Sequence, residues 1–386
     1  GAVKNSGKLT LNNSLVGYNT TSTCDTVGGI NNSGTLVLEN SGVMDNGIAP
    51  QCDSSYLEAG GGIVNDIEGK VTLTDSIVAN NWASGSGGGI RNKGNLTAIN
   101  TVIADNEVTG NGGGIDNQGY LTVTNGMITH NTVMATAEQS NDAVSSPVGQ
   151  GGGIYNSRTL IISSSTVSDN ITTAINVFGA FKSPPTFFSG GGIFSAAHAQ
   201  LTLTNSTIAN NTAYTDGGGI VNDGGDMTAS FCTIYGNSAQ GSGGGIVTSD
   251  ATVGDGEIVP AHLYIKGNIV AGNRASVQAG IVGEVTTDGY NLIQDFFDTM
   301  FVYPHRKYAT DLAVENFSSL GIDAILRDNG GQSWLHPWTH RLLRGSPAID
   351  RIPPNACNLG SHPTDELGTK RPQGKGCDIG AYEYIG

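Results

Sequence analysis

The feature that most constrains the fold of this 386-residue chain is a short internal repeat. Its parts are a Gly-Gly-Ile-x-Asn stretch, a turn, a Leu-x-Leu stretch and an Asn-Ser-x-Ile-x-x-Asn stretch, as residues 84–106 illustrate. The isoleucine of the first part recurs at Ile30, Ile63, Ile90, Ile115, Ile154, Ile193, Ile220 and Ile246. The apolar pair of the second part recurs at Leu9/Leu11, Leu36/Leu38, Val71/Leu73, Leu96/Ala98, Leu121/Val123, Leu160/Ile162, Leu201/Leu203, Met227/Ala229 and Leu263/Ile265.

Each part of the repeat alternates inward apolar and outward polar positions, which predicts three short strands in every unit. Because no unit holds an amphipathic helical stretch, the strands of successive units must pair with each other. The sequence therefore predicts an all-β fold, a right-handed parallel β-helix of about nine to ten coils over residues 1–298. The hand follows from the general preference for right-handed parallel crossovers. Residues 299–386 are predicted to form a small irregular C-terminal cap.

The corner positions of the repeat are small or carry amides. Paired glycines such as Gly88 and Gly89 suit a backbone that packs closely against the next coil. The closing asparagine recurs in every unit, and stacked asparagines can hydrogen-bond from coil to coil, so a structural ladder is predicted. Its members are Asn19, Asn46, Asn81, Asn106, Asn131, Asn170, Asn211, Asn237 and Asn273.

Composition excludes two classes of partner. A net charge of −15 would repel a phosphate backbone, so nucleic acid is not expected to bind. The chain contains no apolar run long enough to span a bilayer, so no membrane-spanning segment is expected.

The five cysteines fall into two predicted pairs and one free thiol. Cys24 and Cys52 lie at the same corner of consecutive coils, within reach of a disulfide. Cys357 and Cys377 bracket a short Pro/Gly-rich stretch and are predicted to form a second bond. Cys232 takes an inward serine slot and is predicted to be a buried free thiol. Paired cysteines are typical of an oxidising compartment outside the cytoplasm.

Insertions enter the repeat mainly at one corner, at 47–59, 132–150 and 171–189, with another at 249–260. Loops at one corner of a solenoid form a face. The third loop carries four phenylalanines, which either pack on the rod or form a contact surface for a glycan or a protein: Phe178, Phe181, Phe187 and Phe188.

The N-terminal end of the chain aligns with the first part of the repeat, at residues 1–5. An uncovered end of a β-helix offers unpaired strands to another chain. We therefore expect either a removed preceding segment or a cap supplied by a second copy, and the latter would stack copies head to tail into a filament.

The C-terminal region carries three motifs in order: Asn329-Gly-Gly, Gly345-Ser-Pro-Ala-Ile-Asp350 and Asp378-Ile-Gly-Ala-Tyr-Glu383. These motifs resemble the ending of large secreted bacterial β-helix proteins known as choice-of-anchor Q domain proteins. The repeats are more loosely similar to polymorphic outer membrane protein repeats, with Ile or Val where those have Phe. The resemblance implies a secreted or surface-attached bacterial protein and brings no catalytic residues.

Enzymatic chemistry on a β-helix requires paired carboxylates, or a calcium cluster with a basic residue. The outward acids Asp75, Asp105, Asp116 and Asp169 are isolated in columns of Asn, Ser and Thr. The densest acidic group consists of Asp216, Asp223 and Asp226. We interpret these residues as turn residues whose carboxylates are solvated. His336 and His340 have the spacing of a metal site, but Pro337 between them disfavours a helix, so a structural role is expected. No catalytic residue, metal or cofactor is expected.

The sequence thus favours a non-enzymatic extracellular or cell-surface rod with a structural or adhesive role, with end-to-end self-association and a glycan or cell-surface partner as candidate interactions. The alternative is a β-helix that binds or cleaves polysaccharide.

Overall fold

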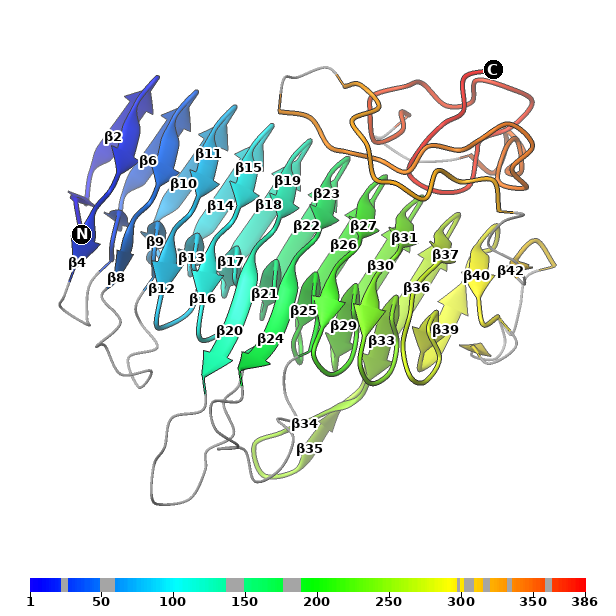
Figure 1. Cartoon of the computed structure of the whole chain (residues 1–386), viewed down its shortest axis with the longest axis horizontal. Coiled ribbons are helices and arrows are strands. Elements are labelled where there is room, and N and C mark those ends of the chain that lie inside the picture. Colours follow the sequence, from blue (N-terminus) through cyan, green and yellow to red (C-terminus); the bar gives the residue numbers. More distant parts are fainter. Residues whose placement is uncertain are drawn as a thin grey trace.

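The computed structural model describes residues 1–21, 27–48, 60–136, 149–175, 189–296, 299–301, 309–314, 320–331, 335–357 and 363–386. Its described part contains strands, turns and bends and no helix. The strands wind into a parallel β-helix, a straight rod whose coils follow one another along the long axis (Figure 1). The fold class predicted from the repeat is therefore confirmed.

Three long parallel sheets and one shorter sheet run along the rod. Sheet A, which begins at the Gly-Gly-Ile part of each repeat, consists of β1 (Val3–Asn5), β5 (Ile30–Asn32), β9 (Ile63–Asn65), β13 (Ile90–Asn92), β17 (Ile115–Asn117), β21 (Ile154–Asn156), β25 (Ile193–Ser195), β29 (Ile220–Asp223), β33 (Ile246–Ser249) and β38 (Ile281–Val282). Sheet B, from the Leu-x-Leu part, consists of β2 (Lys8–Asn12), β6 (Thr35–Glu39), β10 (Lys70–Thr74), β14 (Asn95–Ile99), β18 (Tyr120–Thr124), β22 (Thr159–Ser163), β26 (Gln200–Thr204), β30 (Asp226–Ser230), β36 (His262–Lys266), β39 (Glu284–Thr287) and β41 (Met300–Phe301).

Sheet C, from the third part, consists of β3 (Leu15–Gly17), β7 (Gly42–Met44), β11 (Ile77–Ala79), β15 (Val102–Ala104), β19 (Met127–Thr129), β23 (Thr166–Ser168), β27 (Thr207–Ala209), β31 (Thr233–Tyr235), β37 (Ile269–Ala271), β40 (Leu292–Gln294) and β42 (Leu312–Val314). Sheet D consists of β4 (Thr20–Thr21), β8 (Gly47–Ile48), β12 (Trp82–Ala83), β16 (Glu107–Val108), β20 (Thr132–Thr136), β24 (Ile171–Ile175), β28 (Thr212–Ala213) and β32 (Ser238–Ala239). The hairpin of β34 (Ala251–Val253) and β35 (Glu257–Val259) is antiparallel and lies within the insertion at 249–260. Because β41 and β42 join sheets B and C, the rod extends past the predicted boundary at residue 298.

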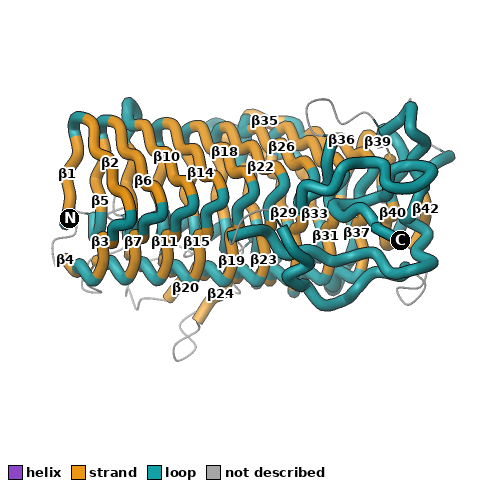
Figure 2. The backbone as a smooth tube through the Cα atoms, turned by 90° about the horizontal axis from the view of Figure 1, so that it is seen from above, coloured by secondary structure: helices purple, strands orange, loops and turns teal. Residues whose placement is uncertain are grey.

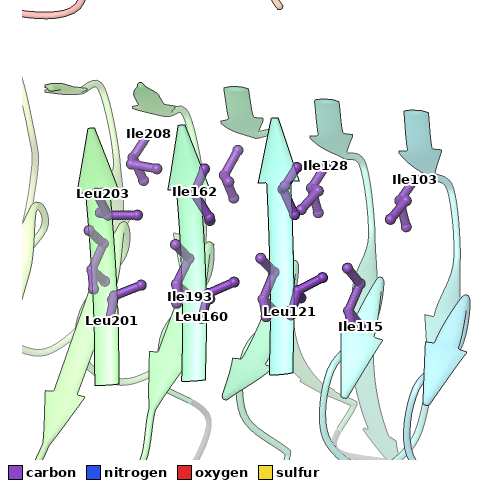
Figure 3. Packing of buried hydrophobic residues seen from close by; sticks show 14 of the residues in the cluster. Ile103, Ile115, Leu121, Ile128, Leu160, Ile162, Ile193, Leu201, Leu203 and Ile208 are labelled. Carbon is purple, nitrogen blue, oxygen red and sulfur yellow. The ribbon is translucent and has the colours of Figure 1, made fainter. Parts of the chain in front are cut away.

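The core lies inside the rod and repeats from coil to coil. The isoleucines that open the strands of sheet A pair with each other in register, for example Ile90 with Ile115 and Ile115 with Ile154. Figure 3 shows inward side chains of successive coils side by side, for example Leu121, Leu160 and Leu201. Together with the inward pairs of sheet B and the central residues of sheet C, they form one continuous apolar cluster. The alternation in the sequence thus corresponds to an inward and an outward face.

Two of the corners require a left-handed backbone, which explains their residue types. The corner between sheets B and C, here called the B–C corner column, has positive φ at Asn13, Asn40, Asp75, Asn100, Asn125, Ser164, Asn205 and Phe231. The corner between sheets C and D has positive φ at Tyr18, Asp45, Asn80, Asp105, His130, Asp169, Asn210, Gly236 and Gly272. Asn, Asp and Gly tolerate this conformation best, so Asp75, Asp105 and Asp169 are turn residues.

The nine closing asparagines form one hydrogen-bonded ladder beside sheet C. Each Nδ2 group donates to the Oδ1 atom of the asparagine in the next coil, at 2.7 to 3.0 Å, from Asn19 through to Asn273. A second ladder follows the end of sheet A from Asn5 to Asn156. It continues to the shorter Ser195, and the Oδ1 atom of Asn222 in the following coil has no partner in the described structure.

The chain after the last coil folds back along the side of the rod instead of crossing its end. We call residues 320–386, as far as they are described, the flank segment. Figures 1 and 2 show it lying beside the later coils, and it packs on the outer face of sheet C. The irregular structure predicted for this region is present, but it covers a side of the rod.

Candidate functional site

The flank segment is held on sheet C by a second apolar cluster. Outward residues of the rod, among them Phe231, Ile269 and Leu292, pack against Ile352 and Ile379 of the flank segment and their neighbours. These side chains are nearly inaccessible to solvent. The outer face of sheet C is therefore an internal surface over these coils.

A column of threonines on the outer face of sheet C supplies polar contacts to the same segment. The Thr166 hydroxyl donates to the backbone oxygen of Trp338 at 2.7 Å. The Thr207 hydroxyl bonds to the Glu366 carboxyl group. The Thr233 hydroxyl accepts a hydrogen bond from the backbone nitrogen of Ala381 at 3.0 Å. Three successive coils thus fix three separate parts of the flank segment.

A buried ionic cluster closes the end of the flank segment. The Arg371 guanidinium group donates to Glu383 at 3.0 Å and to the backbone oxygen of Asp378 at 2.9 Å. It also lies over the Phe231 ring, 5.3 Å from its centroid. Burial raises the pKa of Glu383 above its usual range, and it raises the pKa of Asp378 to about 6. The cluster is structural, because its charged groups are hidden from solvent.

The predicted disulfide between Cys357 and Cys377 is present, with a Cα–Cα distance of 5.9 Å. Cys377 lies in the second apolar cluster, so the bond ties the 357 turn to the part of the segment that packs on the rod. Cys24 and Cys52, the other predicted pair, lie outside the described residues.

A pocket of about 450 Å³ opens where the flank segment meets the B–C corner column. The rod side of the pocket is lined by three successive members of that column, Asn100, Asn125 and Ser164. The left-handed backbone at these positions turns the chain from sheet B to sheet C and places the three side chains in a row. They are partly exposed, and their polar ends are the rod's contribution to the pocket.

The flank side of the pocket contributes a carboxyl group, an imidazole and two apolar side chains. Glu366 is 1% exposed, and its Oε1 atom accepts from the Thr166 hydroxyl at 3.2 Å. Burial raises the pKa of Glu366 well above its usual range. His336 is paired through Nε2 with Asp328 at 2.6 Å, and this hydrogen bond lowers the pKa of Asp328. Pro337 and Leu367 complete this wall.

The predicted acidic group does not converge on a site. Asp216 accepts a hydrogen bond from the backbone of Ser242, at the corner before sheet A. At the far end of β29, Asp223 pairs with the Ser249 hydroxyl at 3.2 Å. Asp226 pairs with His262 at 2.9 Å, and both side chains are exposed. The three carboxylates have separate partners; Asp223 ends β29 and Asp226 begins β30, on either side of a short turn, so these two are strand-end residues.

Asp116 has a different environment from the one its isolation suggested. It lies 1% exposed on the outer face of sheet A, 3.5 Å from the guanidinium group of Arg91 in the preceding coil. In the next two coils of the same column, the rings of Tyr155 and Phe194 stack at 5.7 Å. Burial, together with the charge of Asp116, raises the pKa of Tyr155 to about 12. Arg91, Asp116 and Phe194 are thus buried in this column and Tyr155 is partly exposed, so their contacts are structural.

The two histidines with metal-like spacing have separate structural partners. His340 is buried, its Nδ1 atom lies 2.8 Å from the Asp323 backbone oxygen, and its ring packs on Tyr235 at 4.8 Å. His336 belongs to the pocket. No group of three His, Cys, Asp or Glu side chains suited to a metal ion occurs in the part of the chain that the structure describes.

Cys232 is a buried free thiol in the apolar core. Its Sγ atom donates to the Ser230 backbone oxygen, as the Ser206 hydroxyl does to Thr204 in the preceding coil. Burial raises the pKa of Cys232 to about 12, so the thiolate required of a nucleophile does not form near neutral pH. The predicted contact residues Phe178, Phe181, Phe187 and Phe188 lie outside the described residues.

Sequence reasoning missed the pocket and its buried carboxyl group. Glu366 lies in a single-copy region with no repeat register to indicate its partners. One signal was available: threonine occupies the first outward position of sheet C in three successive coils, at Thr166, Thr207 and Thr233, where earlier coils have Ile77, Val102 and Met127. Such a change of residue type along one column indicates a covered surface.

No protein-family model, no curated protein and no solved structure matches the chain. Among the described residues, no helix has the length and apolar character required to cross a bilayer.

Proposed function

We propose that the protein is a non-enzymatic structural rod that acts outside the cytoplasm, at a bacterial cell surface or after secretion, in a structural or adhesive role. The observation that carries this proposal is the ladder of nine asparagines. It satisfies buried polar groups over nine consecutive coils and links each of these coils to the next. A continuous ladder suits an element that must keep its shape.

Two further observations support a location outside the cytoplasm. The Cys357–Cys377 disulfide joins parts of the flank segment, and structural disulfides persist mainly in oxidising compartments. The three motifs of the C-terminal region resemble those of secreted bacterial β-helix proteins. The presence of the disulfide can be tested directly on the protein taken from its source cells.

The test of location combines two measurements on those cells. Free thiols are alkylated before lysis, and mass spectrometry then reports whether Cys357 and Cys377 are disulfide-bonded. Immunogold microscopy with an antibody against the rod reports where the protein lies. We expect the oxidised pair and label at the surface or in the medium. A reduced pair with cytoplasmic label would refute the location.

Head-to-tail assembly stays a prediction and is tested by negative-stain electron microscopy of the purified chain. At about 4.8 Å between paired strands, an eleven-stranded sheet corresponds to a rod of roughly 50 Å. Filaments with a multiple of this length that dissociate on dilution are expected if copies stack end to end. Single rods at every concentration would exclude self-association of this chain.

The alternative function, cleavage of polysaccharide, is tested by turnover. The purified protein is incubated with neutral and acidic polysaccharides, with and without calcium, and new reducing ends and unsaturated products are measured. We expect neither product. Sustained turnover that is lost on substitution of a pocket residue would replace the structural proposal with an enzymatic one.

A further inference from the structure

We propose that the pocket between the flank segment and the B–C corner column is a binding site for a neutral saccharide, held by the Asn100 and Asn125 amides and the Ser164 hydroxyl. This inference goes beyond the structural role and does not depend on where the protein is located. It gives the rod a specific contact with a glycan.

The first argument is unused hydrogen-bonding capacity on the rod wall. Within the described chain, the side chains of Asn125 and Ser164 make no hydrogen bond, although both line the pocket. Asn205, the next member of the column, donates to the Thr364 backbone oxygen at 2.7 Å where the flank segment lies directly on it. At the pocket the flank segment therefore leaves the side chains of Asn125 and Ser164 without a hydrogen-bond partner among the described residues, while Asn100 Nδ2 donates to Asp75 Oδ1 at 3.0 Å.

The second argument is the kind of polar group present. An amide both donates and accepts hydrogen bonds, and so does a hydroxyl group. A sugar hydroxyl also donates and accepts, so such a lining can pair with several of them in a row. Pro337 and Leu367 add apolar surface against which the C–H face of a sugar ring can pack.

The third argument is charge, which favours a neutral ligand over an acidic one. The residues that line the pocket include no lysine or arginine among those the structure describes. The only basic group, His336, is paired with the Asp328 carboxylate, so that pair has no net positive charge. A chain with a net charge of −15 would further repel a uronate or a phosphate.

The fourth argument is size. Ligand pockets typically enclose about 300–1,000 Å³, and this pocket has about 450 Å³. This is enough for a short stretch of sugar rings. It also opens beside the rod, so a longer chain can continue into solvent.

The test is the binding of defined oligosaccharides to the full chain. Binding is measured by calorimetry and by changes in the methyl NMR signals of leucine-labelled protein. The neutral probes are cellotriose, maltotriose, mannotriose and N,N′,N″-triacetylchitotriose, and the acidic probe is trigalacturonate. We expect at least one neutral probe to bind and to shift the Leu367 methyl signals, which report on the pocket. The signals of Leu73, buried in the rod core, should not move.

Variants at the corner column locate the site. Asn125→Gly and Ser164→Gly remove the polar groups while keeping a residue that tolerates the left-handed backbone, at φ 51° and 47°. Asn40→Gly is the matched control, because Asn40 occupies the same column at φ 48° but is exposed and lies outside the pocket. We expect Asn125→Gly to weaken binding at least about tenfold, the loss expected for one or two hydrogen bonds, and Asn40→Gly to leave it unchanged.

Three results would overturn the proposal. One is that none of the neutral probes binds at about 10 mM, so that the pocket holds only water. Another is that trigalacturonate binds more tightly than every neutral probe. The third is that Asn125→Gly and Asn40→Gly, both shown to fold by circular dichroism, have equal effects. None of these results would affect the disulfide or the location of the protein, so the two proposals fail separately.

Discussion

The asparagine ladder allows the energy of one coil-to-coil connection to be worked out from its contacts. Asn131 is fully buried, and its Nδ2 group donates to Asn170 Oδ1 and to the Ile103 backbone oxygen, both at 2.9 Å. Its Oδ1 atom accepts from the backbone nitrogen of Asn106 at 3.1 Å and from Asn106 Nδ2 at 2.9 Å. The Nδ2 group also lies 3.1 Å from the Thr129 backbone oxygen, a third acceptor for its two protons. The change Asn131→Ala removes all of these contacts, which amount to two donated and two accepted protons.

We expect Asn131→Ala to lower the free energy of unfolding of the surrounding coils by about 4 kcal/mol, from about 1 kcal/mol for each bond. The cost is not larger because Asn170 Oδ1 still accepts from the backbone nitrogen of Asn131 at 3.0 Å. Each coil contacts only its neighbours, so the loss should be local. It should be greatest for the coils that contain Asn106, Asn131 and Asn170.

Hydrogen exchange followed by mass spectrometry measures this local opening. A loss of about 4 kcal/mol corresponds to roughly 10³-fold faster exchange where opening is local, since each tenfold change equals about 1.4 kcal/mol. Asn95→Ala is the matched control, because it removes the same amide from an exposed position at the start of β14. Equal exchange rates in the two variants would refute the idea that the ladder stabilises the rod.

Three further predictions concern the corners, the ionic cluster and the disulfide. Gly114→Ala should destabilise the rod by more than 1 kcal/mol in urea unfolding, because the added methyl group would lie 2.7 Å from the Gly153 backbone oxygen, whereas Gly7→Ala, with nothing within 4 Å, should have little effect. Burial raises the pKa of Asp378 from 3.8 to about 6, so its contribution is fully present below about pH 4 and is lost as the pH rises through 6. The flank segment should thus be more stable by about 1.4 kcal/mol at pH 5 than at pH 8 in unfolding followed by tryptophan fluorescence, and Asp378→Asn should reduce this difference. Cys357→Ser should lower the stability of the flank segment by about 3 kcal/mol and leave exchange in the first coils unchanged, and an equal loss along the whole chain would contradict a local role for the bond with Cys377.

The rod could be predicted from the sequence because each position of the repeat, such as the inward isoleucine or the closing asparagine, recurs in many coils. Ile90, Ile115 and Ile154 occupy equivalent positions, and a parallel β-helix is the arrangement that buries all of them with one register. The same repetition places Asn106 above Asn131. A repeated pattern of this kind makes the prediction secure, since the alignment of strands in one coil must agree with the alignment in all the others.

The pocket could not be predicted because it depends on a contact between the repeat and a single-copy segment. Nothing in the sequence around Glu366 states which coil it meets, and the hydrogen bonds to Thr166 and Thr207 join residues about two hundred and about 160 positions apart. We predicted a cap because the terminal segments of solenoids usually cover the open end of the core. The flank segment lies on sheet C instead because that sheet offers a row of apolar and hydroxyl side chains.

Phe231 shows how a departure from the template marks such a contact. It occupies the B–C corner column with φ 55°, where other coils have Asn, Asp or Ser, and a left-handed backbone costs a bulky residue roughly 1–2 kcal/mol. The side chain is 1% exposed, beneath the Arg371 guanidinium group and within the apolar cluster of the flank segment. Burial of a phenylalanine contributes roughly 1.5–3 kcal/mol, enough to offset the strain.

The same reasoning applies in reverse to Asn125 and Ser164. These residues keep the small polar type of the column although the flank segment passes beside them, and their side chains make no contact with it by hydrogen bonds in the described structure. Where the flank segment covers the column, the side chain either packs as an apolar group, as Phe231 does, or hydrogen-bonds to the segment, as Asn205 does with the Thr364 backbone oxygen. Within the column, Asn125 and Ser164 are thus the positions for which we propose that a ligand supplies the missing partners.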